Sequence, residues 1–184
     1  MKFNFFSKNV TLVKLTDKIF VNTLAKQAAC IQLAKADETV VFIAWFDDTT
    51  HAFRNLFSLN NIPEGRILQA KALHSGKIGK HIPVFLEHFP LAADEEELVK
   101  NWNLEKVDVY NALDEPIFQR FGGDKVKELL LKLGLQEDEA IEHPLISKAI
   151  INGQSNLAKK VNFPATASSQ QAWFEKNIDG KNFL

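Results

Sequence analysis

The run Thr39–Phe46, with the sequence TVVFIAWF, is the feature that most limits how this chain can fold. It is short, rich in β-branched residues, almost continuously apolar, and bounded on both sides by acidic residues. A strand of this kind is buried on both faces, and burial on both faces is typical of a parallel sheet covered by helices. The run Ile82–Phe89 (IPVFLEHF) has the same character and predicts a second buried strand.

The rest of the first 112 residues alternates strand and helix signals, which favours an α/β fold. Thr23 is expected to cap a helix, and Asp47-Asp48-Thr49-Thr50 to supply the N-cap of the next one. We therefore predict an open, mostly parallel sheet flanked by helices over residues 1–112. Its strand order stays open because the third strand signal is weak. The other expected strands are Lys18–Asn22, Arg66–Leu73 and Lys106–Tyr110, and the expected helices are Leu24–Ala36, a helix carrying Phe53, Leu56 and Phe57, and Asp94–Trp102.

Strand signals end near Glu115, and residues 113–163 predict a helical extension packed on the sheet domain. Asp124 can cap an amphipathic helix, and Pro144 opens a second helix at its first turn. Residues 164–184 are expected to form a loosely ordered tail. The apolar positions of the first helix are Val126, Leu129, Leu130 and Leu133, and those of the second are Ile146, Ala149, Ile150, Gly153 and Leu157.

Several chemistries lack their sequence signature. The chain has no GxxxxGK[ST] or GxGxxG loop to cradle a phosphate, no HExxH and no GxSxG. Its one cysteine, Cys30, permits neither an internal disulfide nor a cysteine-based metal site. We therefore expect no catalytic residue, no metal and no cofactor.

Charge and hydropathy limit the partners. The net charge of −1 does not indicate the basic surface that nucleic-acid binding requires. No apolar run reaches the roughly 20 residues of a membrane helix, and the N-terminus does not read as a signal peptide. The sequence thus predicts a soluble, cytoplasmic protein without nucleic-acid binding or membrane insertion.

Polar residues follow several of the expected strands, at the edge where α/β sheets bind ligands. The candidate ligand-binding residues are Asp47, Asp48, Thr49, Thr50, His74, Glu87 and His88. Carboxylates and a histidine meeting at one edge can bind a metal or act as acid and base. The alternative is structural: the first four residues also suit a helix N-cap, and a Glu-His pair often forms a structural hydrogen bond.

The segment Leu113–Phe163 resembles the stretch of the SecA preprotein-translocase motor that closes its second nucleotide-binding fold and leads into its scaffold helix. An acidic pair, Phe-Gly with a charged cap, Leu-Gly, Ile-Glu-His and Asn-Phe follow in the same order and spacing. The matching residues are Asp114-Glu115, Phe121-Gly122, Asp124, Leu133-Gly134, Ile141-Glu142-His143, Gln154 and Asn162-Phe163. A looser likeness extends upstream to about residue 38, with Glu87-His88 near the place of the family's Glu-Arg-His.

The resemblance implies a nucleotide-binding-type α/β fold without a P-loop. The departures from the family's pattern argue against its activity. No Gly-Arg-Gly-Thr-Asp motif lies between Leu73 and Ile82, and the arginine-rich stretch is replaced by the acidic run Leu91–Glu97. Adjacent carboxylates repel a triphosphate instead of stabilising charge that develops on it.

Two hypotheses follow. The first is a non-catalytic SecA-like module that binds another protein, through self-association or an export-related partner. The second is a small enzyme or a ligand- or metal-binding protein that uses Asp47, Asp48, Glu87 and His88.

Overall fold

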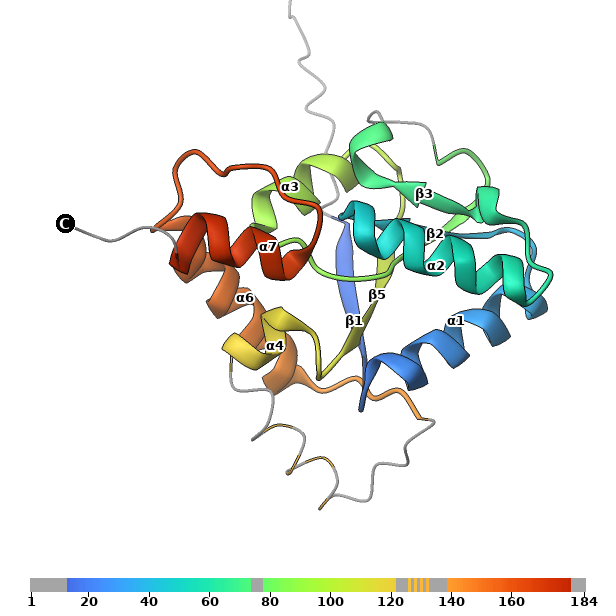
Figure 1. Cartoon of the computed structure of the whole chain (residues 1–184), viewed down its shortest axis with the longest axis horizontal. Helices are drawn as coiled ribbons and strands as arrows, with labels where there is room; N and C mark the ends of the chain where they lie inside the picture. Colours follow the sequence, from blue (N-terminus) through green and yellow to red (C-terminus); the bar gives the residue numbers. More distant parts are fainter. Residues whose placement is uncertain are drawn as a thin grey trace, which may run out of the picture.

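The protein is an open parallel β-sheet with helices on both faces, as the sequence predicts (Figure 1). The computed structural model describes residues 13–73, 78–121 and 139–179, together with residues 126, 128, 130 and 132. The five strands lie in the order β1-β5-β4-β2-β3, which settles the order that the sequence left open. All neighbouring pairs are parallel. The strands are β1 (Lys14–Phe20), β2 (Val40–Ala44), β3 (Ile67–Gln69), β4 (Ile82–Phe85) and β5 (Lys106–Ala112).

Strand β2 is buried along its whole length, in agreement with its continuous apolar run. It pairs with β4 on one side and β3 on the other. Strand β3 is much shorter than the expected Arg66–Leu73, because the chain turns into a short 3₁₀ helix, η2 (Ala70–Ala72), directly after Gln69. A second one, η1 (Glu64–Arg66), precedes β3.

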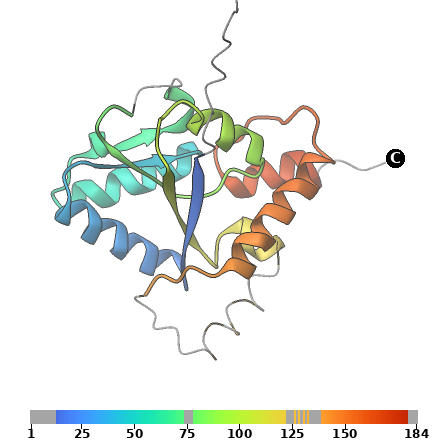
Figure 2. The ribbon, with the colours of Figure 1, turned by 180° about the vertical axis from the view of Figure 1, so that it is seen from behind.

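The two faces of the sheet carry separate clusters of buried side chains. Helices α1 (Thr23–Ala36) and α2 (Asp47–Leu59) cover one face, where Cys30 and Phe57 pack against Phe42 of β2. Helix α3 (Ala92–Val99) covers the opposite face, where Leu98 packs with Ile43. Figures 1 and 2 show the two coverings from the front and from behind.

The helix starts differ from the expected caps. Asn22, and not Thr23, is the N-cap of α1, and its side chain accepts a hydrogen bond from the Ala25 amide at 2.9 Å. Phe46 is the N-cap of α2 and offers no side-chain acceptor, so Asp47-Asp48-Thr49-Thr50 forms the first turn of the helix instead of its cap. The side chains of this turn are therefore free for other contacts.

A group of C-terminal helices packs beside the β1 edge of the sheet, at the left of Figure 1. These are α4 (Pro116–Arg120), α6 (Pro144–Ala158), α7 (Gln170–Phe174) and the π-helical turn η3 (Glu175–Asp179). Ile19 of β1 and Ile141 exchange both backbone hydrogen bonds, at 2.9 and 3.0 Å, in an antiparallel bridge. The extension is thus joined to the sheet by backbone pairing as well as by apolar packing.

Helix α6 begins at Pro144 as predicted and turns its apolar residues inward. Ile146, Ile150, Gly153 and Leu157 are buried, and Ala149 is half-buried. Of the preceding predicted helix the structure describes Val126, which packs on this cluster, and Leu130, which is buried within it. Its residues Leu129 and Leu133 lie outside the described residues.

The expectation of a loosely ordered tail is wrong for residues 164–179. Trp173 and Phe174 are 1% and 0% exposed and belong to the cluster formed with α4 and α6. Asn177 is also buried, and its side chain bonds both the amide and the carbonyl of Ala165. Burial of two large aromatic side chains outweighs the polar composition of the preceding loop. The boundary at residue 112 between a sheet domain and an extension stays a prediction.

Gly153 gives a test of this packing. A Cβ atom at position 153 would overlap the ring of Phe121. Gly153→Ala is expected to lower the free energy of unfolding by about 1–3 kcal/mol, the usual cost of overpacking a core, measured by urea denaturation. Gly153→Ala combined with Phe121→Leu should recover much of the loss. Equal stability of the wild type and the single variant would contradict the close approach of α6 to Phe121.

Candidate functional site

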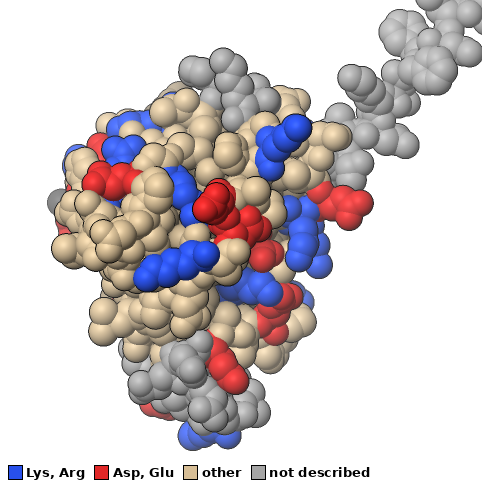
Figure 3. Space-filling model, turned by 90° about the vertical axis from the view of Figure 1, so that its right-hand side faces the viewer, with Lys and Arg blue, Asp and Glu red and all other residues tan. Residues whose placement is uncertain are grey.

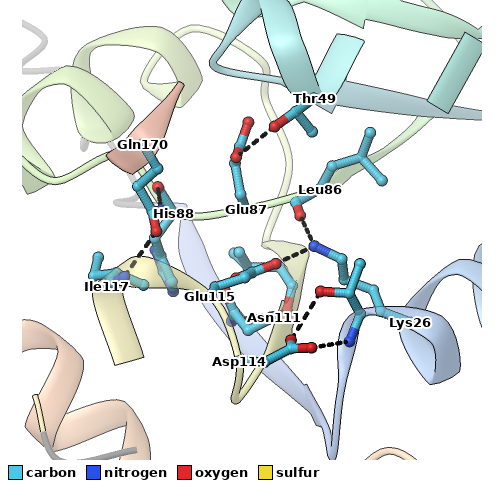
Figure 4. Close-up of polar contacts among 12 residues, drawn as sticks. Lys26, Thr49, Leu86, Glu87, His88, Asn111, Asp114, Glu115, Ile117 and Gln170 are labelled. Carbon is cyan, nitrogen blue, oxygen red and sulfur yellow. Dashed lines mark hydrogen bonds and ion pairs between the residues drawn. The ribbon is translucent and has the colours of Figure 1, made fainter. Parts of the chain in front are cut away.

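Glu87 lies just beyond β4, at the carboxyl edge of the sheet, and turns toward the start of α2. Its Oε1 accepts hydrogen bonds from the amides of Trp45 and Phe46 at 3.1 and 3.2 Å. Its Oε2 accepts a hydrogen bond from the Thr49 hydroxyl at 2.8 Å (Figure 4). Burial raises the pKa of Glu87 to about 7, although Lys26 acts in the opposite direction. The carboxyl group therefore lies at the N-terminus of α2, in the position where a bound anion would accept hydrogen bonds from these two amides.

Lys26 enters the same region from α1. Its side chain is 4% exposed, and its Nζ forms an ion pair with Glu115 and donates to the Leu86 carbonyl at 2.7 Å (Figure 4). Burial disfavours the charged lysine, but the attraction of Glu115 is stronger and raises the pKa of Lys26 above its ordinary value. Lys26 thus carries a charge in the interior that is already neutralised by the chain itself.

Asp114 accepts hydrogen bonds at the N-terminus of α1, as Glu87 does at the N-terminus of α2. Its two carboxylate oxygens accept the Thr23 amide at 3.1 Å and the Thr23 hydroxyl at 2.8 Å (Figure 4). Helix N-termini attract anions because their first amides are free and the helix dipole is positive there. The N-termini of α1 and α2 therefore each receive a carboxylate from the chain itself.

His88 points away from Glu87 and bridges two buried carboxylates. Its Nε2 lies 2.6 Å from Asp17 Oδ1, and its Nδ1 lies 3.0 Å from Glu95 Oε1. Burial alone would lower the pKa of His88, but Glu95 and Asp17 outweigh it and raise that pKa to about 10. Burial also opposes ionisation of Asp17, but the hydrogen bond and charge of His88 hold the pKa of Asp17 below its usual value. The three side chains form a charged, fully enclosed bridge between β1 and α3.

Amide side chains extend this bridge to the C-terminal helices. Gln154 of α6 donates to Glu95 Oε2 at 3.0 Å and to the Phe89 carbonyl at 2.8 Å. Gln170 of α7 donates to the His88 carbonyl at 3.0 Å and accepts the Ile117 amide at 2.8 Å, as Figure 4 shows. The network therefore fixes both helices to the end of β4.

The predicted ligand-binding residues do not share one cleft. Glu87 and Thr49 meet through a hydrogen bond, whereas His88 belongs to the separate bridge. Asp47 faces Lys71 at 2.6 Å and also accepts from Gln69, and Asp48 lies 3.4 Å from the Ser168 hydroxyl. Thr50 donates to the Phe46 carbonyl at 2.9 Å, as an internal helix bond. His74 lies outside the described residues.

A groove opens beside this edge, between the end of β2, η2, α3 and the loop before α7. Its volume is about 1120 Å³. Its lining includes the half-buried aromatic side chains of Trp45 and Phe89, the buried Trp173, and backbone and side chains of residues 164–168. Of the predicted residues within the described part of the chain, Asp47 alone lines it. The same part of the chain holds no group of three or more His, Cys, Asp or Glu placed around a metal ion.

Sequence reasoning missed the residues with the most buried polar contacts. Lys26 stands in a helix of mixed character, and nothing in its neighbours signals burial. The acidic pair Asp114-Glu115 was noted, but only as part of the SecA resemblance. The partners of His88 lie 71 and 7 residues away along the chain, so no local spacing indicates them.

The face of the protein in Figure 3 shows no large patch of one charge that would bind a strongly charged partner. Lysine and arginine side chains lie beside acidic ones there, and neither sign forms a continuous patch. No helix within the described residues combines the length and apolar character that crossing a membrane requires.

SecA proteins are among the known proteins that are similar to this chain. The "Protein translocase subunit SecA" of Acidithiobacillus ferrooxidans is 43% identical over 51 residues, 28% of this chain and 6% of that protein. SecA 1 of Alkaliphilus metalliredigens is 42% identical over 48 residues, and SecA of Desulforapulum autotrophicum is 46% identical over 48 residues. Each of these two alignments covers 26% of this chain, and they cover 5% and 6% of the relatives. No family model matches the chain.

The chain therefore contains a SecA-like segment of about 50 residues, and the resemblance stated from the sequence is confirmed. The aligned length equals that of Leu113–Phe163, the segment on which the resemblance was based. Since the alignments span about one twentieth of the relatives' length, they compare one part of a SecA protein with one part of this chain.

Proposed function

We propose that this chain is a non-hydrolysing SecA-like domain that acts by contact with another protein, in a role related to protein export and in the cytoplasm. It uses no catalytic residue and no cofactor. The observation that carries the first part is the pair of internal carboxylates, Asp114 and Glu87, at the N-termini of α1 and α2.

A polyphosphate at the carboxyl edge would need free amides and a free cation. The Thr23 amide is bonded to Asp114, and the Trp45 and Phe46 amides are bonded to Glu87. Lys26 is enclosed and paired with Glu115. A phosphate would have to displace a carboxylate at either helix and would meet its negative charge, which strongly disfavours binding.

The acidic run that replaces the family's arginines acts differently from the sequence expectation. Asp94 and Glu97 face outward, but Glu95 is buried and bonded to His88. The repulsion argued from three adjacent carboxylates is thus reduced to the exposed ones. The carboxylates at the helix starts give the stronger support for the proposal.

ATP with Mg²⁺ is expected to leave the thermal midpoint of the purified protein unchanged, and phosphate release is expected to stay at the background rate. A ligand at a hundred times its dissociation constant would add about 2.7 kcal/mol of stability, which a thermal-shift assay detects easily. A SecA motor protein assayed in parallel serves as the positive control. ATP-dependent stabilisation, or phosphate release above a no-protein blank, would contradict the proposal.

The protein-contact part is supported by the SecA-like segment, since the relatives are named as subunits of a protein translocase. The buried apolar face of α6 no longer requires a partner, because it packs on the chain's own core. The outer side of α6 still exposes Leu145 and Ile151, at 68% and 60%. Leu145→Lys with Ile151→Lys tests this surface. The double variant should no longer capture a partner, or should no longer form a dimer that light scattering detects. Its thermal midpoint should stay within a few degrees of the wild-type value.

The rival hypothesis of a ligand or metal site at Asp47, Asp48, Glu87 and His88 is less favoured by the geometry. Glu87 and His88 point to different partners, and Asp47 is paired with Lys71. The same thermal-shift assay with divalent cations tests it. Stabilisation that is lost in both Asp48→Ala and Glu87→Ala would revive this hypothesis.

A further inference from the structure

Helix α6, orange in Figure 2, turns one side toward solvent, and that side carries lysines and apolar side chains but no acidic residue. At about 100° per residue, the exposed residues form one continuous arc of about 160°, and the buried residues lie on the other side of the helix. We call this arc the outer face of α6. Its residues are Leu145, Lys148, Ile151, Asn152, Ser155, Asn156 and Ala158, with Lys159 directly after the helix.

The lysines lie in the middle of the outer face, between its two large apolar side chains. Leu145 and Ile151, both mostly exposed, are about 120° apart around the helix axis, and Lys148 lies halfway between them. Lys159 follows three turns later on nearly the same line, about 16 Å along the axis. The outer face therefore combines a row of positive charge with apolar surface on either side.

The part of the chain that the structure describes does not neutralise these lysines. No carboxylate in that part lies within 4 Å of the Nζ atom of Lys148, Lys159 or Lys160. The one polar contact that the structure gives them joins Lys159 Nζ to the neutral side-chain oxygen of Asn156 at 3.4 Å, within the described residues. A partner that carries carboxylates would therefore meet uncompensated positive charge at this face.

We propose that the outer face of α6 binds an acidic segment of another protein that also carries apolar side chains. The carboxylates of that segment pair with Lys148 and Lys159, and its apolar side chains pack on Leu145 and Ile151. Burial of the two exposed apolar side chains supplies affinity, whereas the charges select the partner and its orientation. This inference rests on the proposed protein-contact role and adds the chemistry of the partner.

A second copy of the chain matches this face poorly. A two-fold dimer places the same surface of both copies in contact, so lysines of one copy would face lysines of the other without an acidic residue between them. An anionic membrane is also less favoured. Helices that lie in a membrane interface present a broad face of large apolar residues, whereas α6 packs that face on the core of the protein.

Binding of a defined acidic peptide to the full chain tests the charge assignment. The probe is a fluorescein-labelled peptide of about 16 residues, with leucine at every third or fourth position and glutamate at the others. The comparison peptide has lysine in place of every glutamate. By fluorescence anisotropy, the wild type should bind the acidic peptide at least about tenfold more tightly, and about 0.5 M salt should reduce this preference by screening the charges.

Charge reversal on the outer face should reverse the preference. Lys148→Glu/Lys159→Glu is expected to bind the lysine peptide about tenfold more tightly than the acidic one. The matched control, Lys35→Glu/Lys80→Glu, makes the same change in net charge at two exposed lysines outside α6 and should still prefer the acidic peptide. Equal binding of both peptides by the wild type, or a preference that survives the reversal on α6, would overturn the proposal.

The apolar part of the face has its own variant. Leu145→Gln/Ile151→Gln should weaken binding of the acidic peptide about tenfold, because two apolar side chains are no longer buried in the complex. The remaining lysines should keep the preference for the acidic peptide over the lysine peptide. Unchanged affinity in this variant would contradict binding on the outer face.

Other occupants would give different results. Sedimentation with phosphatidylglycerol vesicles that is lost in Lys148→Glu/Lys159→Glu, without binding of the acidic peptide, would make the face a membrane surface and overturn the proposal. A dimer that the same variant abolishes would overturn it in favour of a second copy. If Leu145→Lys/Ile151→Lys loses a captured partner but the wild type binds no acidic peptide, the protein-contact role stands and the charge assignment alone is wrong.

Discussion

Replacement of Lys26 by methionine is expected to lower the free energy of unfolding by about 3–5 kcal/mol, the usual cost of breaking a buried ion pair. Methionine keeps most of the volume of the side chain but removes the charge that faces Glu115 and the donor to the Leu86 carbonyl. The second oxygen of Glu115, Oε2, is already buried without a hydrogen-bond partner among the described residues, so the carboxylate would lose its main compensation. Urea denaturation at neutral pH measures the loss.

A double-mutant cycle separates the ion pair from the packing. Lys26→Met with Glu115→Gln removes both charges and should recover a large part of the loss. Ala28→Met, on the exposed side of α1, is the matched control and should change stability by less than about 0.5 kcal/mol. Lys26→Met should also raise the pKa of Glu87 further, since Lys26 is the cation that opposes its shift. If Lys26→Met and the Lys26→Met/Glu115→Gln double variant were equally unstable, loss of the ion pair would not be the cause of the lower stability.

Replacement of His88 by leucine is expected to cost about 3–5 kcal/mol at neutral pH, because it leaves Asp17 and Glu95 buried without their shared cation. The variant should become more stable relative to the wild type as the pH falls from 7 toward 5, since protonation of one carboxyl relieves the uncompensated charge. His51→Leu, at an exposed position on α2, is the control and should show neither effect. A His88→Leu profile parallel to that of the wild type would contradict the charged bridge.

The wild-type protein should lose stability on the alkaline side through the same histidine. The pKa of His88 is about 10 in the folded chain and about 6.5 in an unfolded one. The folded state therefore holds the proton more tightly, and this contribution is complete below about pH 6.5 and lost as the pH rises to 10. Cys30 and Tyr110, each with a pKa raised to about 12, do not titrate in that window. Thermal midpoints between pH 6.5 and 10 should fall in the wild type and stay flatter in His88→Leu.

The parts of the fold that follow from local patterns were predictable. Continuous apolar runs indicated β2 and β4, because a strand with two buried faces has no polar side. The start of α6 at Pro144 followed from the conformational preference of proline. The length of β3 was not predictable, since the 3₁₀ turn at Ala70–Ala72 ends the strand without a glycine or a proline to mark the break. Strand order is set by which strands pair across long separations, and no local signal contains it.

The candidate site was predictable only in position. Residues after β2 and β4 do lie at the carboxyl edge, and Thr49 does meet Glu87. The directions of Glu87 and His88 were not predictable, because they are set by Lys26, Asp17 and Glu95, which come from three other elements. The ordered end of the chain was not predictable from its polar loop, because burial of Trp173 and Phe174 after that loop fixes it on the core.

The bridge between Ile19 and Ile141 has a consequence for the behaviour of the protein at high concentration. Strand β1 is an edge strand of seven residues, long enough to pair with an edge from another molecule. The bridge occupies its backbone groups at Ile19, while the opposite edge strand, β3, has only three residues. Covered and shortened edges are how parallel sheets avoid joining one another into aggregates. The bridge to Ile141 thus removes one of the positions at which another sheet edge could pair with β1.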